Sequence, residues 1–255
     1  MSRQARERSS SGVYHVMMRA VGEGSLFSDV EDRERFIETL IRFKRLCGFL
    51  IYGYCLMSNH LHLLIREQTE TISQIIKRIG ISYAHWYNGK YDRSGYLFQG
   101  RFRSEAVEDD RYLLVVLRYI HQNPVKAGMV EEVSTYRWSS YADYLSSRPR
   151  LTDTGFVLDI FHPQREEAVR SFEQFMAAES KEKCLEYEEY RQKRFSDEEV
   201  RQLIKKEIKA ADVLLIQGMP RGERNRILGQ LKENGIPARQ LSRVTGLSRS
   251  TVAKA

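Results

Sequence analysis

The sequence lacks the features that mark membrane, secreted and zinc-finger proteins. No apolar run in its 255 residues approaches the ~18 residues that a membrane span needs. Residues 1–11 are polar and basic and lack the apolar segment of a secretory signal. Three widely spaced cysteines, Cys47, Cys55 and Cys184, form no CxxC pair, so neither a disulfide framework nor a cysteine zinc site is indicated. These absences favour a cytoplasmic protein that does not enter membranes.

Positive charge, by contrast, is in excess and is unevenly distributed. The formal net charge is +7. Residues 196–255 carry 12 Lys and Arg against 7 Asp and Glu, whereas residues 1–195 carry 29 against 27. A basic segment of this length favours a polyanionic partner, most often nucleic acid, although solubility alone is the alternative explanation.

Hydrophobic periodicity predicts the secondary structure of the first half of the chain. Strands are expected at 13–21, 48–57, 60–65 and 102–108, and helices at 30–46, 71–87 and 109–122. The last helix is expected to stop at Asn123-Pro124, because proline clashes with a continuing helix. The order strand–helix–strand–strand–helix–strand is the ferredoxin-like pattern. It predicts an α+β domain over residues 12–145, with a mainly antiparallel sheet and its helices on one side.

The remaining segments of the chain differ from this domain in composition. Residues 1–11 are interpreted as a flexible basic arm and residues 146–195 as a helical connector. Residues 196–255 are interpreted as an all-α, helix-turn-helix-like DNA-binding domain. Its first helix is expected to begin at SDEEV, residues 196–200, because a capping serine is followed there by acidic residues. Further helices are expected at 221–233 and 237–244.

The end of the chain, IPARQLSRVTGLSRSTVAKA, suggests how this domain meets DNA. Gly246 is expected to make the turn and Ser248 to cap the last helix. Arg249, Ser250 and Thr251 would then lie at the start of a recognition helix, where base edges and phosphates are contacted. The alternative is that this piece only caps the fold.

Two histidines inside an apolar strand, in MSNHLHLLI, are the first candidate site. Side chains two apart on a strand share a face, so His60 and His62 should lie side by side while Leu61 points into the core. Two imidazoles so placed can converge on one metal ion. Alternatively, they are partly exposed histidines that hydrogen-bond to their neighbours.

The helix that ends in RYIHQNPVKAG carries the second candidate. Tyr119 and Asn123 are four residues apart and share a helix face. The Asn oxygen is a competent ligand for a hard cation, and a Tyr hydroxyl beside that ion is a candidate nucleophile. Alternatively, Tyr119 is an aromatic anchor and Asn123 ends the helix.

Several long motifs resemble one protein family. His-Leu-His resembles the His-hydrophobic-His (HUH) signature of single-strand DNA nucleases with tyrosine nucleophiles. YHVMMRAV, GYCLMSNHLHLLI, GYLFQGRFRSEAVEDDRYLLVVLRYIHQNPVKAGMV and YRWSSYADYL together resemble the REP-associated tyrosine transposases, relatives of the one-tyrosine insertion-sequence transposases. The resemblance covers about residues 12–145.

The resemblance implies a role for individual residues. His60 and His62 match the metal-binding histidines, Tyr119 the nucleophile and Asn123 the third ligand, with Gln122 a weaker candidate for that ligand. The implied metal is Mg²⁺ or Mn²⁺, and the implied product is a 5′-phosphotyrosine with a free 3′-hydroxyl. Other tyrosines on matching elements lack the spaced amide partner: Tyr83, Tyr87, Tyr91 and Tyr112.

The segment 86–103, WYNGKYDRSGYLFQGRFR, interleaves aromatic and basic residues. Bases stack on aromatic faces while cations follow phosphates, so Arg101 and Arg103 are candidate DNA contacts, with Arg19 a weaker one. The alternative is that the aromatic residues of this segment are simply core: Trp86, Phe98 and Phe102.

The sequence thus predicts a metal-dependent single-stranded DNA endonuclease and strand transferase. Its expected partners are single-stranded or hairpin DNA and flanking duplex DNA, and the sequence leaves monomer and dimer open. A domesticated DNA-binding regulator with an inactive nuclease core is the alternative. A replication or conjugation initiator with the same histidine chemistry is disfavoured, because RYIHQNPVKAG and GYLFQGRF resemble the transposase branch.

Overall fold

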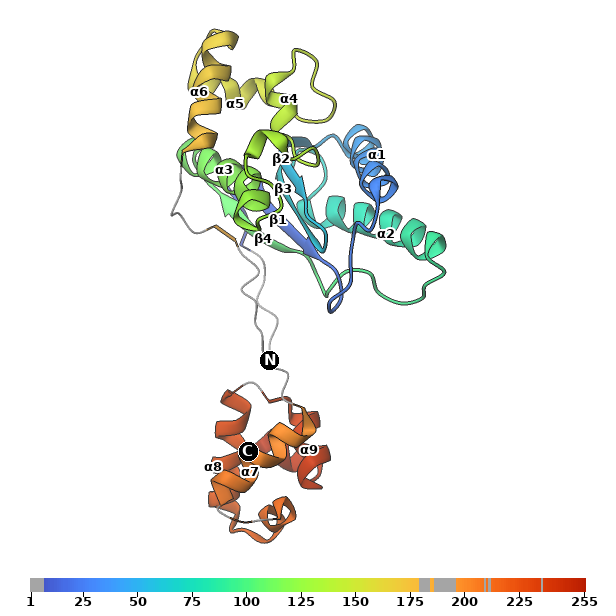
Figure 1. Ribbon diagram of the computed structural model, residues 1–255, viewed down its shortest axis with the longest axis vertical. Coiled ribbons are helices and arrows are strands. Elements are labelled where there is room, and N and C mark those ends of the chain that lie inside the picture. Colours follow the sequence, from blue (N-terminus) through green and yellow to red (C-terminus); the bar gives the residue numbers. More distant parts are fainter. Residues whose placement is uncertain (1–6, 179–183, 186–195, 209, 211, 235) are drawn as a thin grey trace. The chain divides into compact units, whose positions relative to one another are not determined.

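The computed structural model of the chain describes residues 7–178, 184–185, 196–208, 210, 212–234 and 236–255 (Figure 1). These residues fall into two compact units, divided between positions 186 and 187. The first unit contains two hydrophobic cores and the second contains one. Within the described ranges, no helix is long and apolar enough to cross a lipid bilayer.

A four-stranded antiparallel sheet organises the N-terminal unit. Its spatial order is β2-β3-β1-β4, with strands β1 (Val13–Arg19), β2 (Leu50–Leu56), β3 (His60–Arg66) and β4 (Arg103–Val107). The central pair, β1 and β3, aligns Met17 with His62 and Arg19 with His60. The predicted ferredoxin-like sheet is confirmed, and this register brings two strands that are distant in sequence into direct contact.

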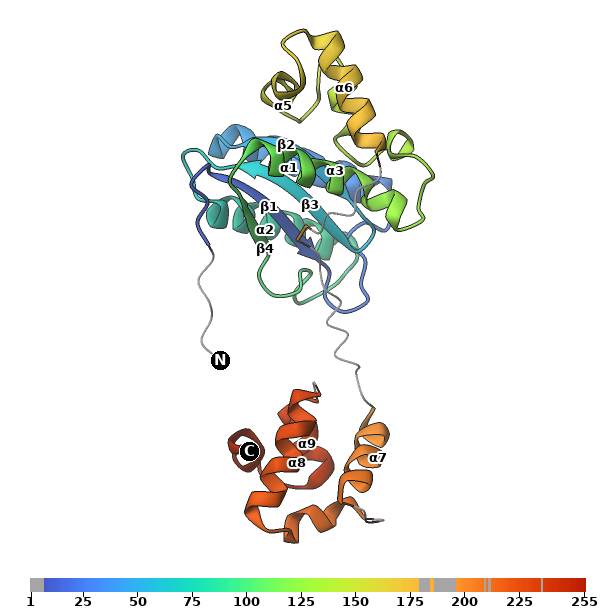
Figure 2. The same cartoon turned by 90° about the vertical axis from the view of Figure 1, so that its left-hand side faces the viewer.

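Helices α1 (Val30–Cys47) and α2 (Ile72–Lys90) cover one face of the sheet (Figures 1 and 2). The side chain of Asp29 caps α1 by accepting a hydrogen bond from the Asp32 N–H, at 2.9 Å. The apolar stripes of both helices pack with sheet residues such as Leu61 in the first core. Both helices of the repeated pattern therefore lie on one side, as predicted.

Helix α3 (Asp110–Lys126) covers the opposite face of the sheet. Leu117 of this helix packs in the second core. The predicted helix end at Asn123-Pro124 is wrong, because Pro124 lies inside the helix. Proline removes one backbone donor, but the Pro124 side chain is buried and the Asn123 carbonyl still accepts a bond from the Ala127 N–H, at 2.9 Å. Tertiary packing carries the helix one turn further.

Residues 146–178 complete the second core and do not form a separate connector. Short elements η1 (Val133–Thr135) and α4 (Tyr141–Leu145) precede α5 (Thr154–Phe161) and α6 (Arg165–Ala177). Phe172 of α6 is fully buried and stacks on Tyr144, with ring centroids 4.4 Å apart. The apolar faces of α5 and α6 thus need the surface that α3 and α4 provide, which the charge clusters in the sequence obscured.

The expected N-terminal arm is partly anchored. The backbone N–H of Ser10 donates to the Glu108 carboxylate at 3.0 Å, so residues 9–11 are tied to the end of β4. Residues 1–6 of the predicted arm lie outside the described residues, as do 179–183 and 186–195 of the predicted connector.

The C-terminal unit is entirely helical in the part that is described. Its elements are α7 (Asp197–Ile208), η2 (Val213–Gly218), α8 (Arg221–Glu233), α9 (Ala238–Thr245) and α10 (Arg249–Lys254). Gly246, in a left-handed conformation with φ of 70°, ends α9. The Ser248 side chain accepts a bond from the Thr251 N–H at 3.1 Å and begins α10. Three apolar residues of α9 and α10 are buried in the core of this unit: Leu241, Val244 and Val252.

Gly53 tests how tightly α3 is held on the sheet. It lies in β2 where the pairing with β3 shifts register, and a Cβ there would lie 2.6 Å from Leu117 Cδ1. We expect Gly53→Ala to displace α3 and lower the free energy of unfolding by ~1–3 kcal/mol, the usual cost of overpacking. Chemical denaturation measures this change. Gly89→Ala in α2 is the control, because a Cβ there would meet no described atom within 4 Å apart from its chain neighbours and the backbone of its own helix turn. Equal stability of the two variants would contradict the close approach.

Candidate active site

Three histidines from the two central strands lie on the sheet face that α3 covers. His60 and His62 share this face, and their ring centroids are 5.1 Å apart. His15 of β1 joins them: its Nε2 lies 2.9 Å from Nδ1 of His62, with ring centroids 5.2 Å apart. Leu61 points into the first core on the opposite face. The predicted side-by-side placement of His60 and His62 is therefore present, with a third imidazole added.

Burial keeps these imidazoles neutral. Desolvation lowers the pKa of both His15 and His62, and the charges that His15 and His60 would carry lower the pKa of His62 further. Desolvation, with a smaller contribution from the charge of Arg19, lowers the pKa of His60 to about 4. The neutral imidazole is the form that coordinates metals, so no proton has to leave His60 or His62 at pH 7.

The ring of Tyr119 packs against this histidine cluster. Its centroid lies 5.7 Å from that of His62 and 5.9 Å from that of His15, both in edge-to-face geometry. The Lys126 ammonium lies 5.1 Å from the centroid of the Tyr119 ring. Tyr119 itself is only 5% exposed. The structure thus brings the predicted nucleophile and the predicted metal ligands together from α3 and β3.

The two candidate amide ligands have different surroundings. Asn123 Nδ2 donates to the Tyr119 carbonyl at 3.0 Å, which orients the amide and leaves Oδ1 as its acceptor. Gln122 Nε2 donates to the carbonyls of Met176 and Ala178 at 2.9 Å and 2.8 Å, and so ties α3 to the end of α6. The Gln122 amide therefore holds α3 against α6. Asn123 bonds only within its own helix in the contacts described above, so it is the preferred candidate for the third metal ligand.

The other tyrosines considered as nucleophiles have structural partners. The hydroxyls of Tyr83 and Tyr87 donate to backbone carbonyls at 2.6 Å and 3.0 Å, from α2 on the opposite face of the sheet. The Tyr91 hydroxyl donates to an aspartate at the start of α1, at 2.9 Å. Tyr112, in the first turn of α3, hydrogen-bonds to a glutamate of β4.

His15 is the residue of this cluster that the sequence analysis missed. Its Nδ1 lies 3.8 Å from Oε2 of Glu105 on β4. If Nε2 of His62 binds a metal, its proton sits on Nδ1 and donates to His15, which then turns its own Nδ1–H to Glu105. The sequence did contain one signal for His15: it is a histidine inside an apolar strand, as are the two histidines of His-Leu-His. The strand register, which joins His15 to His62, was absent from the sequence.

Glu105 is suited to stand behind His15. Burial alone would raise the pKa of its carboxyl, but interactions with His15, Tyr112 and the Leu185 N–H outweigh burial and lower it. Glu105 is therefore a carboxylate at pH 7, and its Oε2 faces His15 Nδ1 at 3.8 Å, slightly beyond hydrogen-bond distance. A carboxylate–histidine pair behind a ligating histidine is a common way to fix its tautomer.

The residues present fit a divalent metal ion at His60 and His62. Nε2 of His62 is buried and has no hydrogen-bond partner among the residues that the structure describes. Nδ1 of His60 lies 2.7 Å from Asn59 Oδ1, which directs its Nε2 toward a ligand role. The described part of the chain holds no group of three or more His, Cys, Asp and Glu with metal-binding geometry. A third ligand would thus be an amide such as Asn123, or come from substrate.

Two of the predicted DNA-contacting arginines share the sheet face of the histidines. Arg19 is paired with His60 across β1 and β3, and Arg103 is paired with Met17 across β1 and β4. Arg101, two residues before Arg103, is exposed. The aromatic residues for which a core role was the alternative are partly buried against the first core: Trp86, Phe98 and Phe102.

In the C-terminal unit, Arg249 and Ser250 are exposed in the first turn of α10. The hydroxyl of Ser248 lies 2.8 Å from those of Ser250 and Thr251. The Thr251 hydroxyl is thus engaged in the helix cap, and the Arg249 guanidinium supplies the positive charge of this turn.

Comparison with known families gives a match within the N-terminal unit. Residues 8–123 match the family model "Transposase IS200 like". This part of the chain is similar to that family. The matched residues include both strands of the histidine cluster and α3 as far as Asn123, and they exclude the C-terminal unit.

Two known proteins resemble this part of the chain. A Haemophilus influenzae protein that carries the name REP-associated tyrosine transposase is 29% identical over 114 residues, which are 39% of this chain and 64% of that relative. The chain therefore spans less than two thirds of that relative's length. A solved structure of a REP-associated tyrosine transposase bound to a REP hairpin has a TM-score of 0.51 at 20% identity, over 58% of this chain and 87% of the other. The second likeness shows a shared fold.

His15→Phe tests the hydrogen-bond chain behind His62. The variant keeps a buried ring but leaves Nδ1 of His62 without its partner, so we expect Mn²⁺ affinity to fall about 10- to 100-fold. Isothermal titration calorimetry measures this affinity directly. His15→Gln offers an amide oxygen to Nδ1 and should restore part of the affinity.

His121→Phe is the matched control for this test, because His121 is also a fully buried histidine but bonds to Ser140 Oγ at 2.6 Å. It should leave Mn²⁺ affinity unchanged. A His15→Phe protein that folds normally and binds Mn²⁺ as tightly as the wild type would contradict the positioning role of His15.

Proposed function

We propose that this protein is a metal-dependent single-stranded DNA endonuclease and strand transferase that acts on hairpin DNA through Tyr119. The observation that carries the proposal is the contact between the Tyr119 ring and His62. The similarity of residues 8–123 to the IS200-like transposase family supports a DNA-processing role. The relative solved with a REP hairpin supports hairpin DNA as the class of substrate.

The proposed reaction exchanges one phosphodiester for another. The Tyr119 hydroxyl oxygen attacks the scissile phosphorus and loses its proton, and the bond from phosphorus to the 3′-oxygen breaks. The departing 3′-oxygen gains a proton, and the 5′-phosphate remains on Tyr119. Because the new bond is also a phosphodiester, little free energy is lost, and a different 3′-hydroxyl can reverse the step and join two strands without a nucleotide cofactor.

His60, His62 and Asn123 are the residues proposed to hold the ion. Mg²⁺ or Mn²⁺ bound there would supply a Lewis acid for the non-bridging phosphate oxygens. An amide oxygen and phosphate oxygens in the ligand set favour these ions over zinc. His15 and Glu105 would keep His62 in its ligating tautomer. Tyrosine, which ionises near pH ~10, is a weak nucleophile in its neutral form and needs such assistance.

Arg19, Arg101 and Arg103 are proposed to contact the DNA backbone around this site. Arg19 pairs with His60 in the sheet, so its position is fixed next to the histidine cluster. We also propose that α9 and α10 act as a helix-turn-helix on flanking duplex DNA, because α10 starts with the exposed Arg249 and Ser250.

Tyr119→Phe tests the nucleophile. The variant keeps the ring that packs on His62 but removes the attacking oxygen, so the covalent protein–DNA adduct should disappear while hairpin binding persists. Wild-type and variant proteins are incubated with a pool of hairpin single strands and Mn²⁺, and adducts are separated by denaturing electrophoresis.

Tyr87→Phe serves as the control, because this tyrosine was also considered as a nucleophile but lies on α2, on the opposite face of the sheet, where its hydroxyl donates to the Ser25 carbonyl at 3.0 Å. It should form the adduct as the wild type does. Undiminished adduct in Tyr119→Phe would rule Tyr119 out. Tight DNA binding by the wild type with no cleavage of any hairpin would favour the alternative of a regulator with an inactive core.

Arg249→Ala tests the C-terminal unit. Loss of one phosphate contact should weaken duplex binding for all sequences and reduce the salt slope of the affinity by about 1. Fluorescence anisotropy at several salt concentrations measures both. Arg201→Ala on α7, an exposed arginine that pairs with Glu198 at 3.5 Å, is the control. The same salt slope for Arg249→Ala and the wild type would argue against a contact at α10.

A further inference from the structure

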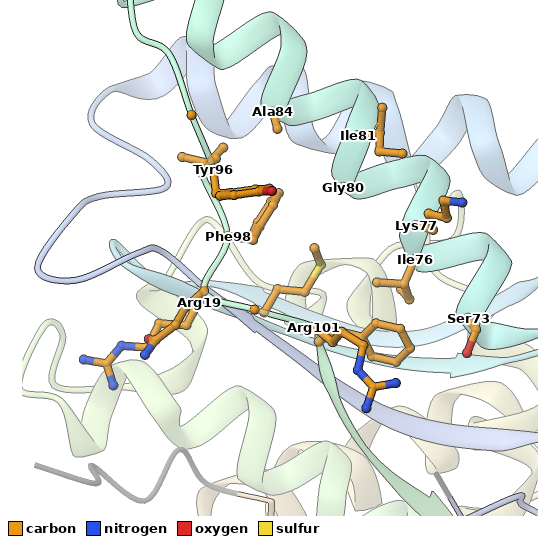
Figure 3. Close-up of a pocket in the computed structure, with 16 residues that line it drawn as sticks. Arg19, Ser73, Ile76, Lys77, Gly80, Ile81, Ala84, Tyr96, Phe98 and Arg101 are labelled. Carbon is orange, nitrogen blue, oxygen red and sulfur yellow. The ribbon is translucent and has the colours of Figure 1, made fainter. Parts of the chain in front are cut away.

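An apolar cavity of about 450 Å³ lies between α2 and the loop of residues 95–102. We call it the α2 pocket. One wall is α2 with Ile76, Gly80 and Ile81, and the other is the loop with Tyr96 and Phe98 (Figure 3). It is separate from the histidine cluster, because α2 covers the opposite face of the sheet. The volume falls within the range of small-ligand sites, ~300–1,000 Å³.

The two walls of the α2 pocket are held in place by the fold. The Val21 N–H donates to the Leu97 carbonyl and the Gln99 N–H donates to the Arg19 carbonyl, at 2.9 Å and 2.8 Å, so the loop continues the edge of β1. Gly80 permits this approach, because a Cβ there would lie 3.2 Å from a Met18 atom and 3.8 Å from the Phe98 ring. A pocket whose walls are fixed before binding loses little conformational entropy when it is filled.

Large apolar side chains remain in solvent at the rim of this pocket. Tyr96 is 90% exposed and Ile81 is 61% exposed. Placing such side chains in water has no benefit for folding, and together they mark a surface that a partner covers.

The charge at the α2 pocket is of one sign. Arg19, Lys77 and Arg101 line it, and among the described residues no aspartate or glutamate does. In Figure 3 the side chains of Arg19 and Arg101 lie at the end of the pocket opposite Ala84 and extend away from its apolar part. A ligand that fits this arrangement has an uncharged, flat apolar part and an adjoining anion.

We propose that the α2 pocket binds one unstacked nucleobase of the single-stranded DNA, next to the phosphate that is cut. The base would enter between Ile81 and the aromatic side chains of the loop, and its phosphates would meet Arg19 and Arg101. Arg19 links the two sites, because it lines the pocket and is also paired with His60 across β1 and β3. This inference rests on the proposed function for its substrate, and it adds a position at which the protein reads a base.

Abasic scanning tests the pocket. The probe is a fluorescently labelled DNA hairpin with a single-stranded flank, selected from a pool for binding to the full-length wild-type protein. Each flank nucleotide is replaced in turn by an abasic nucleotide, which keeps the phosphate and removes the base. We expect one position to weaken binding about tenfold, the typical effect of losing one stacked base.

Ile81→Glu identifies which part of the protein reads that position. In this variant the same abasic change should cost little further affinity, because the base is already excluded from the pocket. Leu46→Glu is the matched control: Leu46 is 65% exposed on α1 and does not line the pocket, and the substitution changes the charge equally. Leu46→Glu should keep the full tenfold penalty.

The outcomes separate this inference from the proposed function. A flat abasic scan, or the same penalty in Ile81→Glu as in the wild type, overturns the pocket even if the Tyr119 adduct forms normally. The proposed function alone is overturned by a different pair of results. In that case the wild type forms no adduct, but one abasic position weakens its binding and that penalty disappears in Ile81→Glu. A wild-type protein that binds no DNA hairpin overturns both.

Discussion

The packing of α3 on the histidine face of the sheet is the contact on which the proposed chemistry depends. Gly53 has no side chain where Leu117 meets β2, so the helix can lie close to the strands. Tyr119 follows Leu117 by two residues, and its ring reaches His62 and His15. The same helix carries Asn123. The geometry of the site therefore follows from how closely one helix approaches one sheet.

Burial of this site keeps its histidines neutral, and it also lowers the stability of the folded chain. Desolvation keeps the imidazoles of His15, His60 and His62 neutral and ready to act as ligands. The same desolvation leaves Nε2 of His62 buried without a hydrogen bond among the described residues, and such a group destabilises a folded chain. A bound cation would remove that penalty. The hydrogen bond between Nδ1 of His62 and Nε2 of His15, and the Glu105 carboxylate 3.8 Å from His15, offset part of the cost of burying the two rings.

Strand β1 connects the two surfaces to which functions are assigned here. Its middle carries His15 behind the proposed metal ligands, and its end carries Arg19 beside His60. The backbone of Arg19 also anchors the loop that forms the α2 pocket. A strand in the centre of a sheet is rigid, so it can hold a reacting phosphate and a neighbouring base at a fixed separation.

The sequence by itself determined the strands of the sheet and the helices α1 and α2 that cover one of its faces. Alternating apolar residues marked the strands, Ile75 and its neighbours at helical spacing marked α2, and His60 and His62 shared a face because a strand has a period of two. The family resemblance was also visible, because the motifs around His-Leu-His and RYIHQNPVKAG are long and contiguous. These features are local, and local features are encoded by adjacent residues.

Only the tertiary structure decided what lies across the sheet and beyond Asn123. The partnership of His15 with His62 and Glu105 comes from strand register, which joins residues that no sequence spacing relates. Pro124 continues α3 because its buried side chain packs well enough to offset one lost hydrogen bond. Helices α5 and α6 join the second core because α3 offers an apolar surface to Phe172 and its neighbours. In each case the free energy comes from contacts between segments far apart in the chain, and a pattern read along the chain contains no record of them.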